Sequence, residues 1–247
     1  MQKLRYQNSA TRRLYPLAAL HSWMARPFSW ALAGLRFSPN VVSLLSLLVS
    51  VAGLWLVATR QVAVGVALVY FGLILDHADG QVARRRGMGS TWGMYLDMAI
   101  DRVVEIGLIL ALMSAPPGLW PSWAPFASGP AAILAAATIG VMMLWRFLTA
   151  YNDVLFLRSH LMATRRLPAI DAAPARLIRR PIFPWVFNRD WVIVLWALGA
   201  LAGQAQATIL LLLALHALSC VEKMLVFSVR HRAPEGDASR ILGPDYH

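Results

Sequence analysis

Residues 76–101 read DHADGQVARRRGMGSTWGMYLDMAID, and the rest of the chain is organised around this segment. It contains four aspartates in two pairs, Asp76 with Asp79 and Asp97 with Asp101, and each pair adjoins a long apolar run. An ionisable side chain at the edge of such a run loses hydration and needs a partner that offsets the loss. The segment therefore predicts two apolar helices joined by a turn, with a functional site where the carboxylates meet.

The spacing within each pair indicates the partner. Residues three or four apart lie on the same side of a helix, so each pair projects from one helix face. Four carboxylates cannot all stay ionised at close range without counter-charge, and the segment contains no lysine. Oxygen-only ligands suit a hard cation such as Mg²⁺ or Mn²⁺, and four carboxylates are enough for two ions. Two such ions can clamp a phosphoryl group during in-line displacement.

The residues between the pairs fit the same chemistry. Gly80 and Ala83 leave a nearly bare helix face beside Asp79, which lets a planar base or a diphosphate approach the backbone closely. Arg84 offers a fork of donors for phosphate oxygens. Gly93, four residues before Asp97, continues a smooth face on the second helix.

As a pattern, the segment is Asp76-x2-Asp79-Gly80-x2-Ala83-Arg84-x8-Gly93-x3-Asp97-x3-Asp101, and it resembles the signature of the CDP-alcohol phosphatidyltransferase family at all eight specified positions. The resemblance implies an integral membrane enzyme with two divalent cations, Mg²⁺ or Mn²⁺. Such an enzyme transfers a substituted phosphate from a CDP-alcohol to an acceptor hydroxyl and releases CMP. The resemblance also suggests a homodimer.

The family's roles transfer to matching positions only. The resemblance implies that Asp76, Asp79 and Asp97 are metal ligands, and that Asp101 is the catalytic base with a share in the second ion. Gly80, Ala83 and Arg84, with Asp79, become the cradle for the cytidine diphosphate. Asn40 follows Pro39 at the start of an apolar run, and this pair is similar to the start of the family's first span. Asn40 is therefore a further nucleotide-binding candidate. The alternative is that it serves only to cap the helix.

Composition bounds the class of protein. The chain has 247 residues, of which 58% are hydrophobic and 14% charged, which is typical of a membrane protein and not of a soluble domain. The net charge of +11 could suggest a nucleic-acid partner, but the basic residues alternate with uncharged segments as the positive-inside rule requires. We therefore expect membrane lipid and no nucleic acid as partner. The single cysteine, Cys220, excludes a disulfide framework, and no cleavable signal is evident.

Hydropathy predicts an all-α polytopic membrane fold with six transmembrane helices. The first expected span is residues 41–59. The second runs from residue 62 into the segment 76–101, and the third runs from that segment to residue 114. The last three are residues 131–157, 191–202 and 207–226. Ser38 and Pro39 read as the N-cap and first residue of the first span. The expected organisation is a cytoplasmic N-terminus in 1–37, a catalytic domain in 38–228 and a disordered tail in 229–247.

Charge and helical rise predict the topology. Of the 23 Lys and Arg, only Arg60 falls in a segment predicted to lie outside, so both termini are expected in the cytoplasm of a cell (inner) membrane. Asp76 and Asp101 each lie about 20 Å from the outer ends of their helices, which places the site in the cytoplasmic leaflet. Residues 17–35, broken at Pro27, read either as an interfacial amphipathic helix or as a helix packed on the enzyme's own surface.

Three other polar residues in apolar runs are site candidates. Glu105 lies one turn beyond Asp101 and can support it or help to bind the acceptor. Arg146 can bind an anionic acceptor group or reach to the headgroups. His77 is a possible ligand by residue type, but it points off the aspartate face. The seven arginines of residues 158–190 are expected mainly to fix topology and hold anionic lipid.

The substrates remain open at this level. We expect CDP-diacylglycerol as donor and an acceptor alcohol in phospholipid biosynthesis. Asp101 followed by Arg102 resembles the members that use inositol phosphate, but their later Tyr-x-Lys-Ala-Arg-Ala-Glu type segment is absent from this chain. The alternative is a soluble CDP-alcohol donor with a lipid or polyol-phosphate acceptor. A divalent-metal transporter is a remote alternative, since it has no need of Gly80, Ala83 and Arg84 at these offsets.

Overall fold

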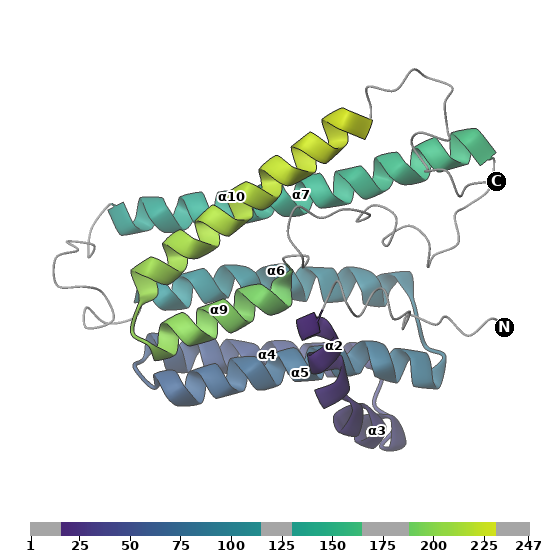
Figure 1. Ribbon diagram of the computed structural model, residues 1–247. Coiled ribbons are helices and arrows are strands. Elements are labelled where there is room, and N and C mark those ends of the chain that lie inside the picture. Colours follow the sequence, from purple (N-terminus) through teal and green to yellow (C-terminus); the bar gives the residue numbers. More distant parts are fainter. Residues whose placement is uncertain (1–15, 115–129, 165–187, 231–247) are drawn as a thin grey trace. The chain divides into compact units, whose positions relative to one another are not determined.

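A computed structural model describes residues 16–114, 130–164 and 188–230, and every regular element in these ranges is an α-helix (Figure 1). The all-helical prediction is confirmed for the described part of the chain. The helices are α2 (Pro16–Met24), α3 (Arg26–Gly34), α4 (Pro39–Ala58), α5 (Val62–Arg86), α6 (Thr91–Ser114), α7 (Pro130–Thr164), α9 (Arg189–Leu201) and α10 (Ala205–Arg230). The predicted outer loop of 115–129, most of the basic connection, and both terminal segments lie outside the described residues.

Among the described helices, four are long and apolar enough to cross a bilayer by length and composition. These segments are Pro39–Ala58, Val62–Arg86, Ile133–Ala150 and Ala205–Glu222. They coincide with four of the six predicted spans, which supports a membrane protein. The other two predicted spans correspond to α6, which carries the charged residues of the site, and to α9, which is 13 residues long.

The ends of α4 and α5 follow from local sequence. The Ser38 hydroxyl accepts a hydrogen bond from the Val41 backbone N–H at 3.4 Å, and Pro39 occupies the first turn of α4 where its missing N–H is not needed. Helix α5 ends at Gly87, whose φ of 64° is the left-handed conformation that glycine adopts without strain. The predicted helix start and the predicted turn are therefore both present.

The N-terminal amphipathic segment forms two helices, α2 and α3. Its break falls at Ala25, two residues before the predicted break at Pro27, because proline is accepted in the first turn of a helix and starts α3 instead of ending α2. Helix α2 contacts both α5 and α9, and α3 contacts α5. Within this part of the chain, both helices therefore pack on the predicted catalytic segment.

The chain divides into two compact units. One contains residues 16–139 and 187–212, and the other includes the described residues 140–164 and 213–230, so α7 and α10 each contribute to both. In the first unit α4 packs against α5 and α6, and α9 also contacts both of them (Figure 1). Its core includes Val69, Leu108 and Trp196, and the Trp196 indole donates a hydrogen bond to the Leu108 carbonyl at 2.8 Å.

Glycines allow α4 and α5 to cross at backbone distance. A Cβ atom on Gly53 would lie 2.6 Å from the Gly65 carbonyl oxygen, and one on Gly65 would lie 2.7 Å from the Val57 backbone nitrogen. A Cβ atom on Gly72 would collide with the Ser50 hydroxyl. Because real Cβ contacts are longer than this, any side chain at these positions must push the two helices apart.

Candidate active site

Three of the four signature aspartates converge. Asp76 comes from α5, while Asp97 and Asp101 come from α6, and each offers a carboxylate oxygen within 4.8 Å of the other two. All three side chains are partly buried. The sequence predicts that two helices bring four aspartates together, and three of the four lie together in the structure.

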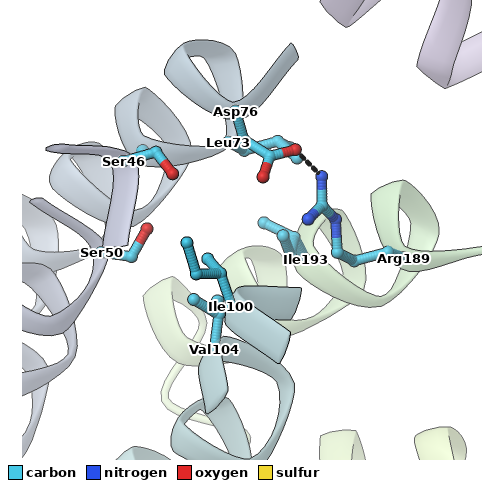
Figure 2. A pocket seen from close by; sticks show the side chains of 9 residues that line it. Ser46, Ser50, Leu73, Asp76, Ile100, Val104, Arg189 and Ile193 are labelled. Carbon is cyan, nitrogen blue, oxygen red and sulfur yellow. Dashed lines mark hydrogen bonds and ion pairs between the residues drawn. The ribbon is translucent and has the colours of Figure 1, made fainter. Parts of the chain in front are cut away.

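Arg189, the first residue of α9, supplies positive charge to this cluster. Its guanidinium forms an ion pair with Asp76 (Figure 2) and a second one with Asp101, and its side chain is 13% exposed. The positive charge paired with the cluster therefore comes from a residue more than eighty positions beyond Asp101. Sequence reasoning had grouped Arg189 with the topology-determining arginines. The available signal was its place at the start of an apolar helix, next to Asp190.

The donor chemistry of the cluster fits a hard divalent cation. All three converging groups are carboxylates, which are the ligands that Mg²⁺ and Mn²⁺ prefer. Arg189 pairs with two of them, so the cluster attracts positive charge. These residues can therefore hold such an ion.

Asp79 lies outside this group of three. Its side chain is buried, and one carboxylate oxygen accepts a hydrogen bond from the Ser43 hydroxyl of α4 at 2.5 Å. The Pro39 carbonyl lies 3.1 Å from the same hydroxyl and is a second acceptor for its single hydrogen, so the first turn of α4 also contacts the serine. The ligand role of Asp79 stays a prediction, and Ser43 is a neighbour that sequence reasoning did not identify.

A small cavity opens beside Asp76 and Arg189. Figure 2 shows the hydroxyls of Ser46 and Ser50, from α4, facing this space opposite the ion pair. Ile100 and Val104 of α6 form an apolar wall. The carboxylate cluster is therefore bordered by polar groups from a third helix and by hydrocarbon.

In the predicted nucleotide cradle, the small residues adjoin the side chains of Arg84 and Asn40. A Cβ atom on Gly80 would lie 3.4 Å from the nearest Arg84 guanidinium nitrogen, so that side chain lies along the glycine. Arg84 is exposed and Ala83 is partly buried. On α6, a Cβ atom on Gly93 would lie 3.2 Å from the Asn40 side-chain oxygen, so the small residue leaves room for Asn40. The nucleotide-binding roles of these residues stay predictions.

Glu105 is connected to Asp101 through an arginine. Glu105 is fully buried, and its carboxylate pairs with the Arg102 guanidinium at 2.6 Å. The other guanidinium nitrogen of Arg102 lies 3.4 Å from Asp101. This arrangement fits a supporting role for Glu105, because Arg102 bridges the carboxylates of Glu105 and Asp101.

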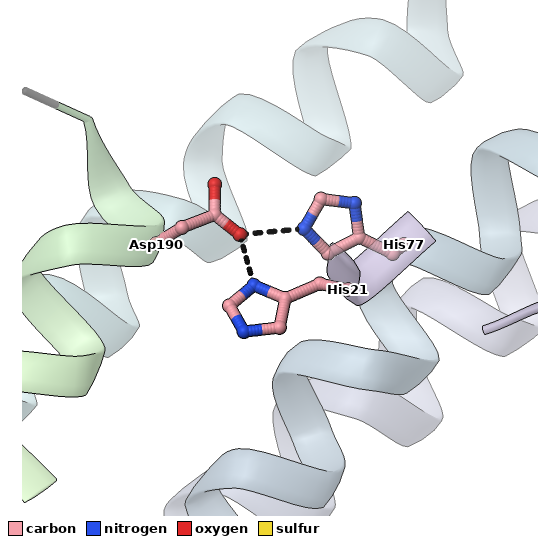
Figure 3. Close-up of side chains that lie close together, drawn as sticks. All are labelled: His21, His77 and Asp190. Atoms are coloured by element: carbon pink, nitrogen blue, oxygen red, sulfur yellow. Dashed lines mark hydrogen bonds and ion pairs between the residues drawn. The ribbon is translucent and has the colours of Figure 1, made fainter. Parts of the chain in front are cut away.

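His77 points away from the carboxylate cluster, as helix geometry predicted. Its Nε2 lies 2.8 Å from Asp190 Oδ1, and the Nδ1 of His21 lies 2.5 Å from the same oxygen (Figure 3). Two imidazoles and a carboxylate are also a possible transition-metal donor set. Hydrogen bonding already accounts for the arrangement, because one carboxylate oxygen can accept from both rings.

The comparison with protein families decides the identity of the fold. The model of the CDP-alcohol phosphatidyltransferase family matches residues 36–225. The chain belongs to this family. The match covers α4 through most of α10 and therefore includes all four signature aspartates, Ser43 and Arg189. A family of membrane enzymes and four apolar helices together mark the chain as a membrane protein.

Individual relatives in the family match over shorter segments. A phosphatidylinositol phosphate synthase of Mycobacterium tuberculosis is 33% identical over 88 residues, which is 35% of this chain and 41% of the relative. A bifunctional IPC transferase and DIPP synthase of Aquifex aeolicus is 34% identical over 88 residues, 36% of this chain and 20% of that protein. The chain thus matches about two fifths of the length of the phosphatidylinositol phosphate synthase.

Solved structures share the fold. Phosphatidylinositol phosphate synthase of Mycobacterium tuberculosis with CDP-DAG bound superposes with a TM-score of 0.57 at 20% identity, over 82% of this chain and 92% of that one. The same enzyme with manganese and citrate gives a TM-score of 0.59 over 82% of this chain and 88% of that one, again at 20% identity. The arrangement of helices is therefore that of the family.

Arg146 belongs to the second compact unit. There its guanidinium lies over the ring of Trp145, 4.3 Å from the ring centroid. Its part in binding the acceptor stays a prediction.

We expect Ser43→Ala to weaken binding of divalent cations about tenfold or more, because partners that orient ligating carboxylates typically contribute that much to metal affinity. The substitution removes the donor to Asp79 while leaving the packing of α4 nearly unchanged. Ser43→Thr keeps the hydroxyl and serves as the matched control. Mn²⁺ affinity measured by electron paramagnetic resonance tests the prediction. Equal affinities for Ser43→Ala and the wild type would contradict it.

Proposed function

We propose that the chain transfers a substituted phosphate group from a CDP-alcohol to an acceptor alcohol and releases CMP. The observation that carries this proposal is the convergence of Asp76, Asp97 and Asp101 from two helices. The family match supports the reaction class. In the proposed reaction the acceptor oxygen bonds to the phosphorus that bears the donor alcohol, and the bond from that phosphorus to the CMP oxygen breaks.

The proposed roles follow the placement of each group. Asp76, Asp79, Asp97 and Asp101 hold two divalent cations, Mg²⁺ or Mn²⁺, which when bound supply positive charge to the phosphoryl group during displacement. Asp101 takes the proton from the acceptor hydroxyl. Arg84 binds the diphosphate where Gly80 and Ala83 leave the helix bare. Glu105, through Arg102, holds the Asp101 carboxylate in position.

For the donor we propose CDP-diacylglycerol, and for the acceptor an alcohol that already carries a phosphate. The donor is supported by the related structure with CDP-DAG bound. The acceptor is supported by the names of the phosphatidylinositol phosphate synthases and by the Asp101–Arg102 pair. The bifunctional IPC transferase and DIPP synthase, whose name states a different activity, is the reason to test soluble CDP-alcohols as well.

We place the site in the cytoplasmic leaflet of a cell membrane crossed six times, with both termini in the cytoplasm. Three counts support this depth. Asp76 lies about 21 Å from the start of α5, Asp101 about 20 Å from the end of α6, and Arg189 about 18 Å from the end of α9, each at 1.5 Å per residue. The three values agree to within about one turn and lie inside a hydrocarbon core of about 30 Å.

We propose that α2 and α3 lie at the membrane interface. This is supported by large exposed apolar side chains on α2, Trp23 at 63% exposure and Leu20 at 47%. Tryptophan prefers the interface between headgroups and hydrocarbon.

We also propose a homodimer, as the family resemblance implies. Light scattering of the purified protein in detergent measures the oligomeric state.

The test is CMP release by purified protein in lipid vesicles. We expect release from CDP-diacylglycerol with Mg²⁺ or Mn²⁺ when an acceptor is present, and loss of release when EDTA removes the cation. The acceptor panel contains inositol phosphate, glycerol phosphate and unphosphorylated inositol, with soluble CDP-alcohols as alternative donors. Absence of CMP with every pair would overturn the proposal, whereas Mn²⁺ uptake into the vesicles without CMP would favour a transporter.

Asp76→Ala tests the shared-ligand arrangement in the same preparation. We expect a loss of Mn²⁺ affinity of at least tenfold, because Asp76 is the only residue of α5 among the three converging carboxylates of the described chain. Retained affinity would contradict the assignment. Leu20→Ala, on the exposed side of α2, is the control for handling and folding.

A further inference from the structure

Helix α5 is held on the side opposite the carboxylate cluster by side chains that the signature leaves unspecified. They recur every three or four residues and so share one face of the helix: Tyr70, Ile74, His77, Gln81 and Arg85. Each of them contacts α2, α3, Ala25 between these helices, or Asp190 at the start of α9. Residues between the family positions therefore have a structural function of their own.

The strongest contacts on this face surround Asp190. One carboxylate oxygen of Asp190 accepts hydrogen bonds from His21 of α2 and from His77 of α5, at 2.5 and 2.8 Å (Figure 3). The second ring nitrogen of His21 pairs with the Tyr70 hydroxyl at 2.8 Å. His21 is fully buried, so these bonds are not exchanged with water. His21 thus joins α2, α5 and α9 at one point.

Further contacts fix α2 and α3 on α5. The Gln81 amide donates to the Ser22 carbonyl at 2.7 Å and accepts from the Ser29 hydroxyl at 2.9 Å. The Arg85 guanidinium lies over the Trp30 ring, 3.9 Å from its centroid. Arg86 donates to the carbonyls of Arg36 and Phe37 in the linker to α4, at 2.8 and 2.6 Å. Two of the three consecutive arginines therefore bind the N-terminal helices or their linker.

Asp190 is the immediate neighbour of Arg189, which pairs with Asp76 and Asp101. The first turn of α9 is consequently held on two sides. The Arg189 guanidinium pairs with the carboxylate cluster, and the Asp190 carboxylate accepts hydrogen bonds from the two histidines. A shift of Asp190 must also move Arg189, because adjacent residues of a helix share its backbone. The position of Arg189 relative to Asp101 thus depends on His21.

We propose that α2 and α3 form a clamp on the catalytic helix, and that His21 is a positioning residue which sets the first turn of α9 against the carboxylate cluster. This inference deepens the proposed function and rests on it for its catalytic consequence. The clamp consists of His21, Ser22, Ala25, Ser29 and Trp30. These residues contact Asp190 and the face of α5 that contains Tyr70, Ile74, His77, Gln81 and Arg85. It couples an N-terminal segment that precedes the family match to the site.

The experiment compares His21→Phe with His21→Asn. Phenylalanine keeps a ring but removes both hydrogen bonds, whereas the asparagine amide nitrogen occupies nearly the place of the Nδ1 that faces Asp190. We expect kcat for CMP release to fall at least tenfold in His21→Phe, with the KM for the CDP-alcohol changed less than threefold, and to recover to within threefold of wild type in His21→Asn. Leu20→Ala, one residue away and exposed, should behave as wild type.

A second readout does not depend on activity. Cys220 is the only cysteine, so Cys220→Ser combined with Ala25→Cys places one thiol at a fully buried position against Ile74 and Ala78. We expect maleimide to label Cys at position 25 at least tenfold faster in His21→Phe than in wild type or His21→Asn. Tyr70→Phe deletes only one hydroxyl and should give a smaller increase in the labelling rate. It replaces His21→Phe in the experiment if His21→Phe does not fold.

The two readouts separate the possible failures. Equal labelling rates in the wild type and the variants would overturn the clamp. Faster labelling with kcat unchanged within twofold would overturn the positioning role of His21. A wild-type protein that releases no CMP from any donor would overturn the proposed function, while the labelling rates would still test the clamp.

Discussion

Replacing Asp101 with asparagine is expected to lower the rate of CMP release by about a thousandfold, within the range of 10²–10⁴ that a positioned general base contributes. Asparagine preserves the shape of the side chain but cannot accept the proton of the acceptor hydroxyl. Since Gly80, Ala83 and Arg84 are unchanged, binding of the nucleotide should remain. Single-turnover CMP release and calorimetric titration with a CDP-alcohol measure the two effects separately.

Glu105→Gln provides the graded comparison for Asp101→Asn. Glu105 pairs with Arg102, which in turn lies beside Asp101, so its neutralisation should reduce the rate by a smaller factor than loss of the base itself. Two results would show that another group takes the proton. One is a rate of CMP release in Asp101→Asn within tenfold of the wild type, and the other is a loss of rate in Glu105→Gln as large as that in Asp101→Asn.

Replacing Arg189 with methionine is expected to make stability depend on divalent cations. Methionine keeps an unbranched stem but removes the charge that pairs with Asp76 and Asp101, and a buried charge left without its partner typically costs about 3–5 kcal/mol. We expect a clear drop in the unfolding temperature in EDTA and a larger stabilisation by Mn²⁺ than in the wild type, because the ion then supplies the missing charge.

Arg26→Met is the matched control, since Arg26 is exposed at the start of α3. Thermal unfolding in detergent, followed by intrinsic tryptophan fluorescence with and without Mn²⁺, measures the difference. The same Mn²⁺-induced shift in Arg189→Met, Arg26→Met and wild type would refute the role of Arg189 as the local counter-charge.

The helices were predictable because their signals are local. Ser38 and Pro39 mark the start of α4, Gly87 ends α5, and long apolar runs fix the spans between them. The meeting of Asp76 with Asp97 and Asp101 was also predictable, because two helices joined by a short turn place both pairs at the same depth. Such inferences need only spacing, rise per residue and hydropathy.

The partners of these groups could not be predicted, because they come from distant parts of the chain. Arg189 stands among several arginines in a basic segment, and although its place at the start of an apolar helix sets it apart, that place does not identify Asp76, 113 positions earlier, as its partner. The same holds for Ser43 beside Asp79 and for His21 beside Asp190. Tertiary packing alone selects one serine, one histidine and one arginine from many chemically equal candidates.

The glycines at which α4 and α5 cross in close backbone contact have a consequence for classifying sequences by motif. Ser43 reaches Asp79 from α4, and Gly53, Gly65 and Gly72 let the two backbones come close enough for such contacts. Two of these glycines lie outside the aspartate pattern by ten residues or more. A homologue that retains every acidic residue but carries valine at these crossings would pass a motif search and still be unable to assemble the centre.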